Sequence, residues 1–324
     1  MLITLFLLAA LAVGGWLAWA VYTPVTPRGN QSVLLHSGYS TRRIGAELKR
    51  AGVIRSIFAF RVWHTLHRKH SLKAGEYLFD RAASIPQVYD RIARGDIYFH
   101  VVTIPEGYTI FDVAKAMEDA GLGSAQEYLK IAQTRTDLIA DLAPEAKSLE
   151  GYLFPNTYQF TRTQSLEEMV GTMVHQFRQV AQQMGLNSDV HRTVTMASIV
   201  EKETAAPEER PVVASVYYNR LAHRVALDAD PSVIYGLLLA GAYTGSLHHH
   251  DLAVNSPYNT YRFPGLPPGP IGNPGQSALQ AAMHPADTQF FYFVSDGNGH
   301  HRFVHSLTEH NRNVAAYRRA LGLH

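Results

Sequence analysis

The apolar positions are densest at the start of the chain, where residues 1–22 contain no charged side chain. A helix of this length would cross the hydrocarbon core of a bilayer. Trp16, Trp19 and Tyr22 cluster at its C-terminal end, as aromatic residues do at a membrane–water interface. The pattern predicts a transmembrane anchor over residues 1–22. The Ala-Trp-Ala triplet at 18–20 would also fit a signal-peptide cleavage site, but the run is longer than a usual signal core.

A pattern of strand, glycine turn and amphipathic helix then occurs twice. Residues 38–40 (Gly-Tyr-Ser) align with 107–109 (Gly-Tyr-Thr), and 51–53 (Ala-Gly-Val) align with 120–122 (Ala-Gly-Leu). Each copy predicts a strand, a helix capped by Ser or Thr, and a glycine stop. Such modules resemble LysM domains, which bind polysaccharides containing N-acetylglucosamine. Two unrelated strand–helix units with the same turn chemistry would give the same pattern.

The remaining elements predict a mixed α+β fold, with the LysM-like modules followed by an α+β catalytic domain. We expect a domain at 23–148, and a second at 149–324 where aromatic residues and prolines become frequent. A proline- and glycine-rich loop over 256–275 is long enough to suggest a functional role. Strands are predicted at 73–79, 289–294 and 302–304, and helices at 85–94, within 124–142, at 166–184, 188–202 and 208–223, from about 231, and after 308.

Composition narrows the chemistry. The chain has 324 residues, of which 46% are hydrophobic and 17% charged, so it is a folded protein. Its net charge of +2 is too small to indicate nucleic-acid binding. With no cysteine, thiol nucleophiles, disulfides and Cys-ligated zinc are excluded. Residues 248–250 are three adjacent histidines that cannot all face one ion, so we expect no metal and no cofactor. No G-x-S-x-G elbow or phosphate-binding glycine loop is present.

Carboxylates are therefore the candidate catalytic groups. Val190, Val194, Ala197 and Glu201 share one stripe of a predicted helix. Desolvation on such a stripe would raise the pKa of Glu201 and let it hold a proton near neutral pH. The alternative is a helix-end glutamate that meets solvent or an arginine. Glu203 lies about 200° around the helix, so the two carboxylates cannot face one cleft.

A glycosidase with two carboxylates would need a partner for Glu201 from elsewhere in the chain. Glu150, Asp228 and Asp230 are the nearby candidates, although Asp230 also fits a helix N-cap. A mechanism with one carboxylate removes the need for a partner. The acid protonates the glycosidic oxygen, and its conjugate base then takes a proton from a substrate hydroxyl that closes on the anomeric carbon.

Six motifs in order resemble the endolytic murein transglycosylases, also described as YceG-like. The likeness covers nearly the whole chain, including the anchor and the LysM-like region. It implies cleavage of the MurNAc–GlcNAc bond inside peptidoglycan strands, with 1,6-anhydroMurNAc ends as product. The motifs are residues 149–158 (LEGYLFPNTY), 197–204 (ASIVEKET), 230–236 (DPSVIYG), 255–261 (NSPYNTY), 265–275 (GLPPGPIGNPG) and 292–294 (YFV).

The resemblance also implies the site and the location. It maps the catalytic glutamate onto Glu201, the first glutamate of E-K-E-T. It places the protein in the bacterial inner membrane as a single-pass protein, with the catalytic domain in the periplasm near peptidoglycan synthases. We expect the other substrate-binding residues to be Glu150, Tyr152, Glu203, Asn255, Tyr258, Asn259 and Tyr261. Structural roles are the alternative for this set, above all for Glu150, and for Tyr258 and Asn259 as turn residues.

Two other functions fit parts of the sequence. A hydrolase of the same glycan would use water and a second carboxylate, and would leave reducing ends. A glycan-binding scaffold without catalysis would recruit synthases through the anchor and the LysM-like part. Substitution of Glu201 by Gln would leave such a scaffold functional. We expect the transglycosylase.

Overall fold

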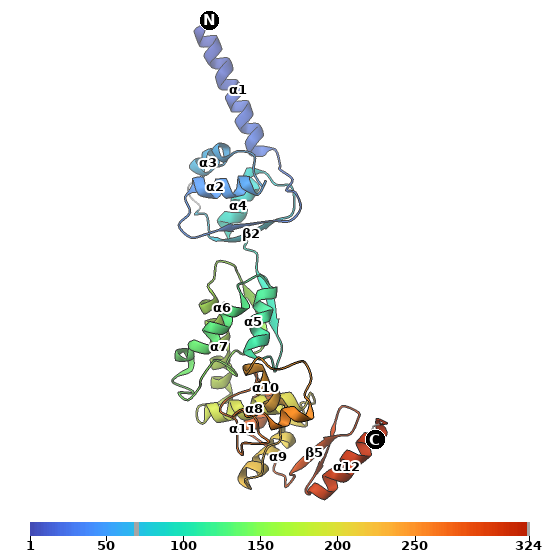
Figure 1. Cartoon of the computed structure of the whole chain (residues 1–324). Coiled ribbons are helices and arrows are strands. Elements are labelled where there is room, and N and C mark those ends of the chain that lie inside the picture. Colours follow the sequence, from blue (N-terminus) through green and yellow to red (C-terminus); the bar gives the residue numbers. More distant parts are fainter. Residues whose placement is uncertain (68–70, 323–324) are drawn as a thin grey trace. The chain divides into compact units, whose positions relative to one another are not determined.

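The computed structural model describes residues 1–67 and 71–322 and divides into two compact units (Figure 1). Unit 1 comprises residues 1–101 and 159–165, and unit 2 comprises 102–158 and 166 onward. Within these described residues the sheets are three separate pairs of short strands among helices, which confirms the predicted α+β class. From Val102 onward the second strand–helix copy belongs to unit 2, and the domain bounds expected from the sequence, 23–148 and 149–324, stay a prediction.

Unit 1 begins with the apolar helix α1 (Leu2–Tyr22), which is long and apolar enough to cross a membrane. Strands β1 (Gln31–Leu35) and β2 (Gly75–Phe79) pair antiparallel, with Val33 opposite Tyr77. Helices pack around this pair and bury a core that includes Leu48, Phe60, Tyr77 and Ile92. These helices are α2 (Thr41–Arg50), α3 (Ile57–Leu66) and α4 (Ile85–Arg94).

The two strand–helix copies share their local geometry, as the sequence predicts. β1–α2 is the first copy, and β3 (His100–Ile104) with α5 (Ile110–Asp119) is the second. Their turns use Gly38 and Gly107 at φ 81° and 78°, in the left-handed region that favours glycine. Ser40 accepts a hydrogen bond from the Arg43 N–H, and Thr109 accepts one from Asp112 in the same way. The likeness to LysM domains stays a prediction.

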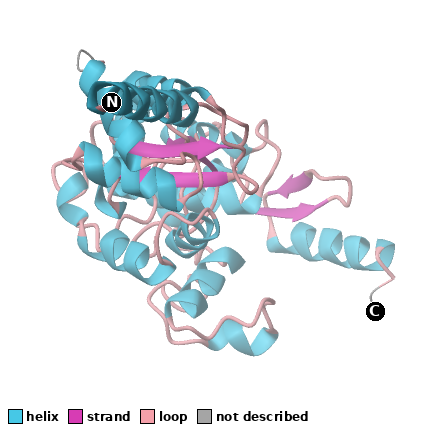
Figure 2. Cartoon of the chain, turned by 90° about the horizontal axis from the view of Figure 1, so that it is seen from above, coloured by secondary structure: helices cyan, strands magenta, loops and turns pink. Residues whose placement is uncertain are grey.

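Unit 2 is built around α8 (Val190–Glu203), in which ten residues are buried. α8 packs against α9 (Arg210–Ala222), α10 (Asp230–Leu239) and α11 (Gln276–Met283). The hairpin of β5 (Tyr292–Ser295) and β6 (His301–Val304) forms a lobe at the edge of this unit with α12 (Leu307–Ala320), which has no buried residue (Figure 2). The other elements are α6 (Ala125–Thr134), η1 (Thr136–Ile139), β4 (Asn156–Phe160), α7 (Leu166–Met184) and η2 (His249–Ala253).

Three features differ from the sequence-based expectations. Helices α3 and α11 and strand β4 were not predicted. The region 124–142 holds a three-turn helix and a short 3₁₀ helix rather than one long helix. Asp230 is the first residue of α10 and makes no side-chain cap, because its carboxylate binds Tyr261 instead.

Candidate active site

The C-terminal turn of α8 carries two carboxylates into different surroundings. The helix continues without a break to Glu203, so Glu201 and Glu203 lie on opposite sides of its last turn. This separation is the one expected from the sequence. Glu201 meets the loops at 105–108 and 272–275, and Glu203 meets α9 and a pocket.

Glu201 forms a buried ion pair. Its Oε1 accepts a hydrogen bond of 2.6 Å from Nη2 of Arg210, the first residue of α9, and its Oε2 accepts one of 2.9 Å from the Gly275 N–H. The Glu201 side chain is 5% exposed and the Arg210 side chain 6%. Burial raises the pKa of Glu201, whereas the Gly275 N–H and the guanidinium of Arg210 oppose that rise. Both carboxylate oxygens are thus engaged by the protein.

Two loops close over this pair and leave little space around it. The Gly107 N–H donates to the carbonyl of Asn273, and the Asn273 N–H donates to the carbonyl of Tyr108, both at 2.8 Å. A Cβ on Gly272 would lie 2.7 Å from the backbone carbonyl oxygen of Gly107, so glycine at position 272 allows the two loops to approach this closely. Glu201 does not line the pocket that Glu203 borders.

Glu203 lines a pocket of about 450 Å³, within the range of small-molecule sites. Its Oε1 accepts a hydrogen bond of 2.7 Å from the hydroxyl of Tyr217. Burial raises the pKa of Glu203 to about 7, against the lowering effect of the Tyr217 hydrogen bond. A carboxyl group with this pKa is half protonated at neutral pH and suits a general acid.

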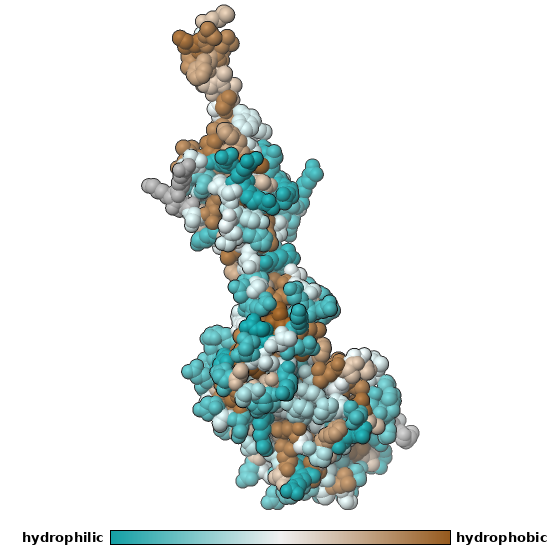
Figure 3. Space-filling model, turned by 60° about the vertical axis from the view of Figure 1, so that its left-hand side comes forward, coloured by the Kyte–Doolittle hydropathy of each residue, from teal (hydrophilic) through white to brown (hydrophobic). Residues whose placement is uncertain are grey.

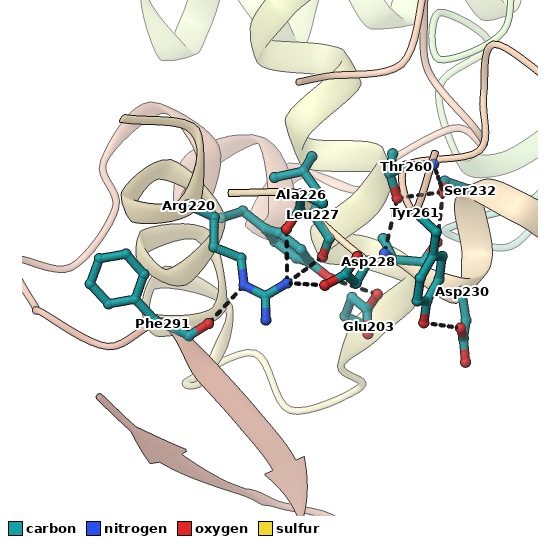
Figure 4. A network of polar contacts seen from close by, with 12 residues as sticks. Glu203, Arg220, Ala226, Leu227, Asp228, Asp230, Ser232, Thr260, Tyr261 and Phe291 are labelled. Atoms are coloured by element: carbon teal, nitrogen blue, oxygen red, sulfur yellow. Dashed lines mark hydrogen bonds and ion pairs between the residues drawn. The ribbon is translucent and has the colours of Figure 1, made fainter. Parts of the chain in front are cut away.

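Arg220 connects three walls of the pocket (Figure 4). Its Nε donates to the carbonyl of Phe291 at the start of the hairpin, and its Nη1 donates to the carbonyls of Ala226 and Leu227. Nη1 also binds Asp228 at 3.1 Å. Asp228 has φ 51°, a left-handed conformation that costs energy in a residue with a side chain. Arg220 therefore holds a strained turn at the pocket wall.

The 255–261 motif forms the next wall. The Tyr261 hydroxyl donates to Oδ1 of Asp230 at 2.6 Å, and both residues line the pocket with Glu203 (Figure 4). Thr260 bonds to Ser232 at 2.8 Å and accepts the Ala229 N–H, which fixes the loop to the start of α10. The pocket therefore combines tyrosine surfaces with carboxylates at defined positions. Its other lining residues are Tyr292, Phe293 and Val294 from β5, Leu307, His310 and Val314 from α12, and Leu227.

Other predicted binding residues make internal contacts. Tyr152 is fully buried and bonds to Nδ1 of His191 at 2.8 Å. Asn259 is fully buried and donates to the carbonyls of Leu252 and Val254, a turn-stabilising role. Tyr258 packs its ring against Tyr235, and Asn255 is exposed. Of the predicted set, the structure brings only Glu203 and Tyr261 together in this pocket.

Glu150 is buried in the interior of unit 2. Both of its oxygens accept the Ile110 N–H, and Oε1 also accepts a hydrogen bond from the Asn273 amide. Burial raises the pKa of Glu150 to about 8, although the Ile110 and Tyr235 hydrogen bonds act in the opposite direction. Its contacts join the 149–158 motif to the 265–275 motif and to the start of α5, and its predicted role in substrate binding stays a prediction.

Glu150→Gln should flatten the dependence of stability on pH. Because the folded pKa is raised above the unfolded value, wild-type stability is greatest below about pH 4.5 and is lost as pH rises through about 8. The neutral amide removes this loss, which is on the order of a few kcal/mol. Urea unfolding of both proteins at pH 5 and pH 8.5 measures it. An equal change in the two proteins would contradict the raised pKa of Glu150.

Sequence reasoning missed several residues that contact Glu201 or line the pocket of Glu203. Arg210, Tyr217 and Arg220 lie on α9, where a helical pattern was predicted without any role for its polar positions. All three are buried, although Arg and Tyr are more often exposed or half-exposed. Tyr292 lies in the 292–294 motif, which was recognised without a role. No local signal marks which of these side chains turn inward.

The fold and the site together define an α+β protein with a pocket lined by carboxyl and tyrosine side chains. The YceG-like family model matches residues 33–316, and the chain belongs to this family. It is 32% identical over 307 residues to an endolytic murein transglycosylase of Bacillus subtilis, covering 88% of this chain and 84% of that protein. An endolytic murein transglycosylase of Streptococcus pneumoniae is 26% identical; the match covers 97% of this chain and 64% of that protein's length.

A solved structure agrees with the family assignment. The crystal structure of a yceG-like protein from Listeria monocytogenes matches with a TM-score of 0.57 and 32% sequence identity. The match covers 87% of this chain and 98% of that one. The resemblance given by the sequence motifs is thereby confirmed at the level of the family.

Proposed function

We propose that this protein is a lytic transglycosylase that cleaves the MurNAc–GlcNAc bond within peptidoglycan strands and leaves 1,6-anhydroMurNAc ends. Membership of the YceG-like family and the names of the Bacillus and Streptococcus relatives support the reaction class. The observation that carries the proposal is Glu203, whose half-buried carboxyl group lies at the wall of a pocket beside the Tyr217 hydroxyl and has a pKa of about 7.

We assign the acid role to Glu203 in place of Glu201. Both oxygens of Glu201 are bonded, and the cation of Arg210 at 2.6 Å favours the ionised form. Glu203 has a neutral phenol as its hydrogen-bond partner and borders open volume in which a sugar ring would fit. Glu201 then acts as a structural partner of Arg210 at the start of α9. The Glu201 assignment from the sequence remains a prediction that the same experiments test.

One carboxyl group completes the proposed reaction. Glu203 donates its proton to the oxygen between C1 of MurNAc and C4 of GlcNAc, the C1–O bond breaks, and GlcNAc leaves with a free 4-hydroxyl. The Glu203 carboxylate then accepts the proton of the MurNAc 6-hydroxyl, whose oxygen bonds to C1. The enzyme returns to its protonated state, and no water is consumed. A pKa near neutrality suits both proton transfers.

The pocket offers the surfaces that a glycan strand needs. The ring of Tyr292 lies beneath the Arg220 guanidinium, 4.9 Å from ring centroid to Cζ, and so is held in place at one wall. Tyr261 is 37% exposed and supplies a second aromatic face. Asp228 and Asp230 add hydrogen-bond acceptors for sugar hydroxyls. The predicted roles of Tyr261 and Glu203 in binding are therefore kept in the proposal.

We also propose that α1 anchors the enzyme in the cytoplasmic membrane as a single span. The helix has 21 residues and a hydropathy sufficient to cross a bilayer. The substrate lies outside the cytoplasm, so units 1 and 2 would face the periplasm. Association with peptidoglycan synthases, implied by the family resemblance, is kept as an expectation of this proposal.

One observation favours a second candidate, a two-carboxylate hydrolase of the same glycan. Asp228 and Asp230 line the same pocket as Glu203, and either could activate a water molecule. Mass spectrometry of purified glycan strands digested by the enzyme separates the two reactions. We expect anhydro-ended fragments. Reducing ends would establish the hydrolase, and Asp228→Asn and Asp230→Asn would then identify the second carboxylate.

A further inference from the structure

Helix α3 presents an apolar stripe to the outside of unit 1. Phe58 is 57% exposed and Leu66 73%, and half-buried Val62 lies between them at a spacing of four residues. These three residues, with Arg61 and Thr65, border one shallow hollow of about 230 Å³. The opposite side of the helix is packed, with Ala59 and Phe60 buried in the core of unit 1. The exposed stripe is thus additional to the core-facing side.

The start of α3 is attached to the end of α1. Arg55, the residue before the N-cap of α3, donates from Nη1 to the carbonyl of Thr23 at 2.5 Å and from Nη2 to that of Pro24 at 2.8 Å. Its guanidinium also lies over the ring of Trp19, 5.0 Å from the centroid. These carbonyls follow the last turn of α1, so Arg55 fixes α3 at the level where the apolar helix ends.

The contact with α1 is repeated two turns along α3. The ring of Trp63 meets Tyr22, the last residue of α1, edge to face with 5.9 Å between centroids. Arg55 and Trp63 therefore both contact the last turn of α1, so α3 stays beside the end of α1 over these two turns. Leu66 follows Trp63 by three residues and Val62 precedes it by one. The stripe therefore lies next to the side of α3 that contacts α1.

We propose that the Phe58–Val62–Leu66 stripe rests in the headgroup layer of the membrane, with a lipid surface as its partner. The inference rests on the proposed anchoring by α1. A 21-residue helix is about 31 Å long, which matches the hydrocarbon thickness, so its last turn lies at the interface. The stripe is held at that turn, where Phe and Leu side chains enter the acyl boundary and arginines meet lipid phosphates.

Charge and hydropathy around the stripe fit this partner. Arg55 and Arg61 flank Phe58, and no Asp or Glu occurs between residues 48 and 75. Figure 3 shows brown, hydrophobic side chains on unit 1 near the base of the apolar helix. An amphipathic helix of this kind would restrict the tilt of unit 1 against the bilayer, in addition to the single point of attachment that α1 provides.

The absence of cysteine from the sequence permits a direct test with single-cysteine probes. The full chain is reconstituted in phosphatidylethanolamine–phosphatidylglycerol vesicles with an environment-sensitive fluorophore at Thr65→Cys, on the stripe. Matched probes are placed at Leu11→Cys, in the middle of α1, and at Phe99→Cys. Phe99 is 42% exposed and follows Tyr98, whose N–H donates to the carbonyl of Glu76 in β2. Figure 1 shows β2 at the end of unit 1 away from α1. Quenchers are carried at shallow or deep positions of the lipid chain.

We expect the Thr65→Cys probe to show a blue-shifted emission and loss of intensity with the shallow quencher, and the Phe99→Cys probe to show neither. Phe58→Ser with Leu66→Ser should abolish the shift at position 65 while the thermal unfolding of unit 1 is retained. Quenching at Leu11→Cys without quenching at Thr65→Cys would overturn this proposal and leave the anchor standing. No quenching at Leu11→Cys would refute the anchor itself. A blue shift at position 65 without lipid quenching would assign the stripe to a protein partner and also overturn the proposal.

Discussion

Glu203→Gln should lower the rate of glycan cleavage by about 10²- to 10⁴-fold, the usual contribution of a general acid. The amide keeps the size of the side chain and can still accept a hydrogen bond from the Tyr217 hydroxyl. It has no acidic proton to transfer to the glycosidic oxygen. Substrate binding should change little. The yield of anhydro-ended fragments per folded molecule, measured by mass spectrometry over time, gives the effect.

Glu201→Gln is the matched control, since it makes the same change two residues away. Its activity per folded molecule should stay within about tenfold of wild type, although its stability falls because Arg210 loses an ionised partner. The reverse ranking of the two variants, at equal folded fractions, would make Glu201 the acid and refute the assignment to Glu203.

In the wild type, kcat/KM should decline as pH rises through about 7, where Glu203 loses its proton.

Arg210→Met should destabilise unit 2 by about 3–5 kcal/mol, the cost of leaving one member of a buried ion pair without its partner. Glu201 would keep only the Gly275 N–H as a donor in a site where its side chain is 5% exposed. Protonation of Glu201 would relieve part of this cost, so the loss should be larger at pH 8 than at pH 5. Urea unfolding at the two pH values measures both effects.

The double variant Arg210→Met with Glu201→Gln supplies the control for this prediction. With both charges gone, neither side chain carries an uncompensated charge, so the double variant should be more stable than Arg210→Met alone. Additive losses from the two substitutions would show that the residues do not depend on each other. A loss below about 1 kcal/mol for Arg210→Met would place the pair among the weak, solvent-screened ion pairs.

Segments with a strong periodic pattern were predicted well from sequence, and segments defined by their neighbours were not. α4 and α7 occupy the expected residues, because their apolar positions repeat with the period of a helix and, in α4, a capping box and Gly95 mark the ends. α3 and α11 are ten and eight residues long and follow loops with mixed signals. Their helical state depends on packing against α2, α8 and α9.

The candidate site shows the same division. The sequence located two glutamates at the end of a buried helix and excluded their facing one cleft, and the structure agrees. The choice between them depended on what covers each side. On one side of α8, Arg210 from α9 covers Glu201. On the other side, residues of α10, the β5–β6 hairpin and α12 line the pocket beside Glu203, and they follow Glu203 by up to 111 residues in the chain. No periodicity in one helix carries that information.

The path of the chain through the two units has a consequence for biosynthesis. Residues 159–165 belong to unit 1, although unit 2 begins at residue 102. A ribosome that has released residues up to 101 has therefore not yet supplied all of unit 1. The segment that completes it emerges only after the 57 residues of unit 2 that span 102–158. We expect the two units to mature together during synthesis, so a nascent chain arrested before residue 165 should be more sensitive to added protease than one arrested after it.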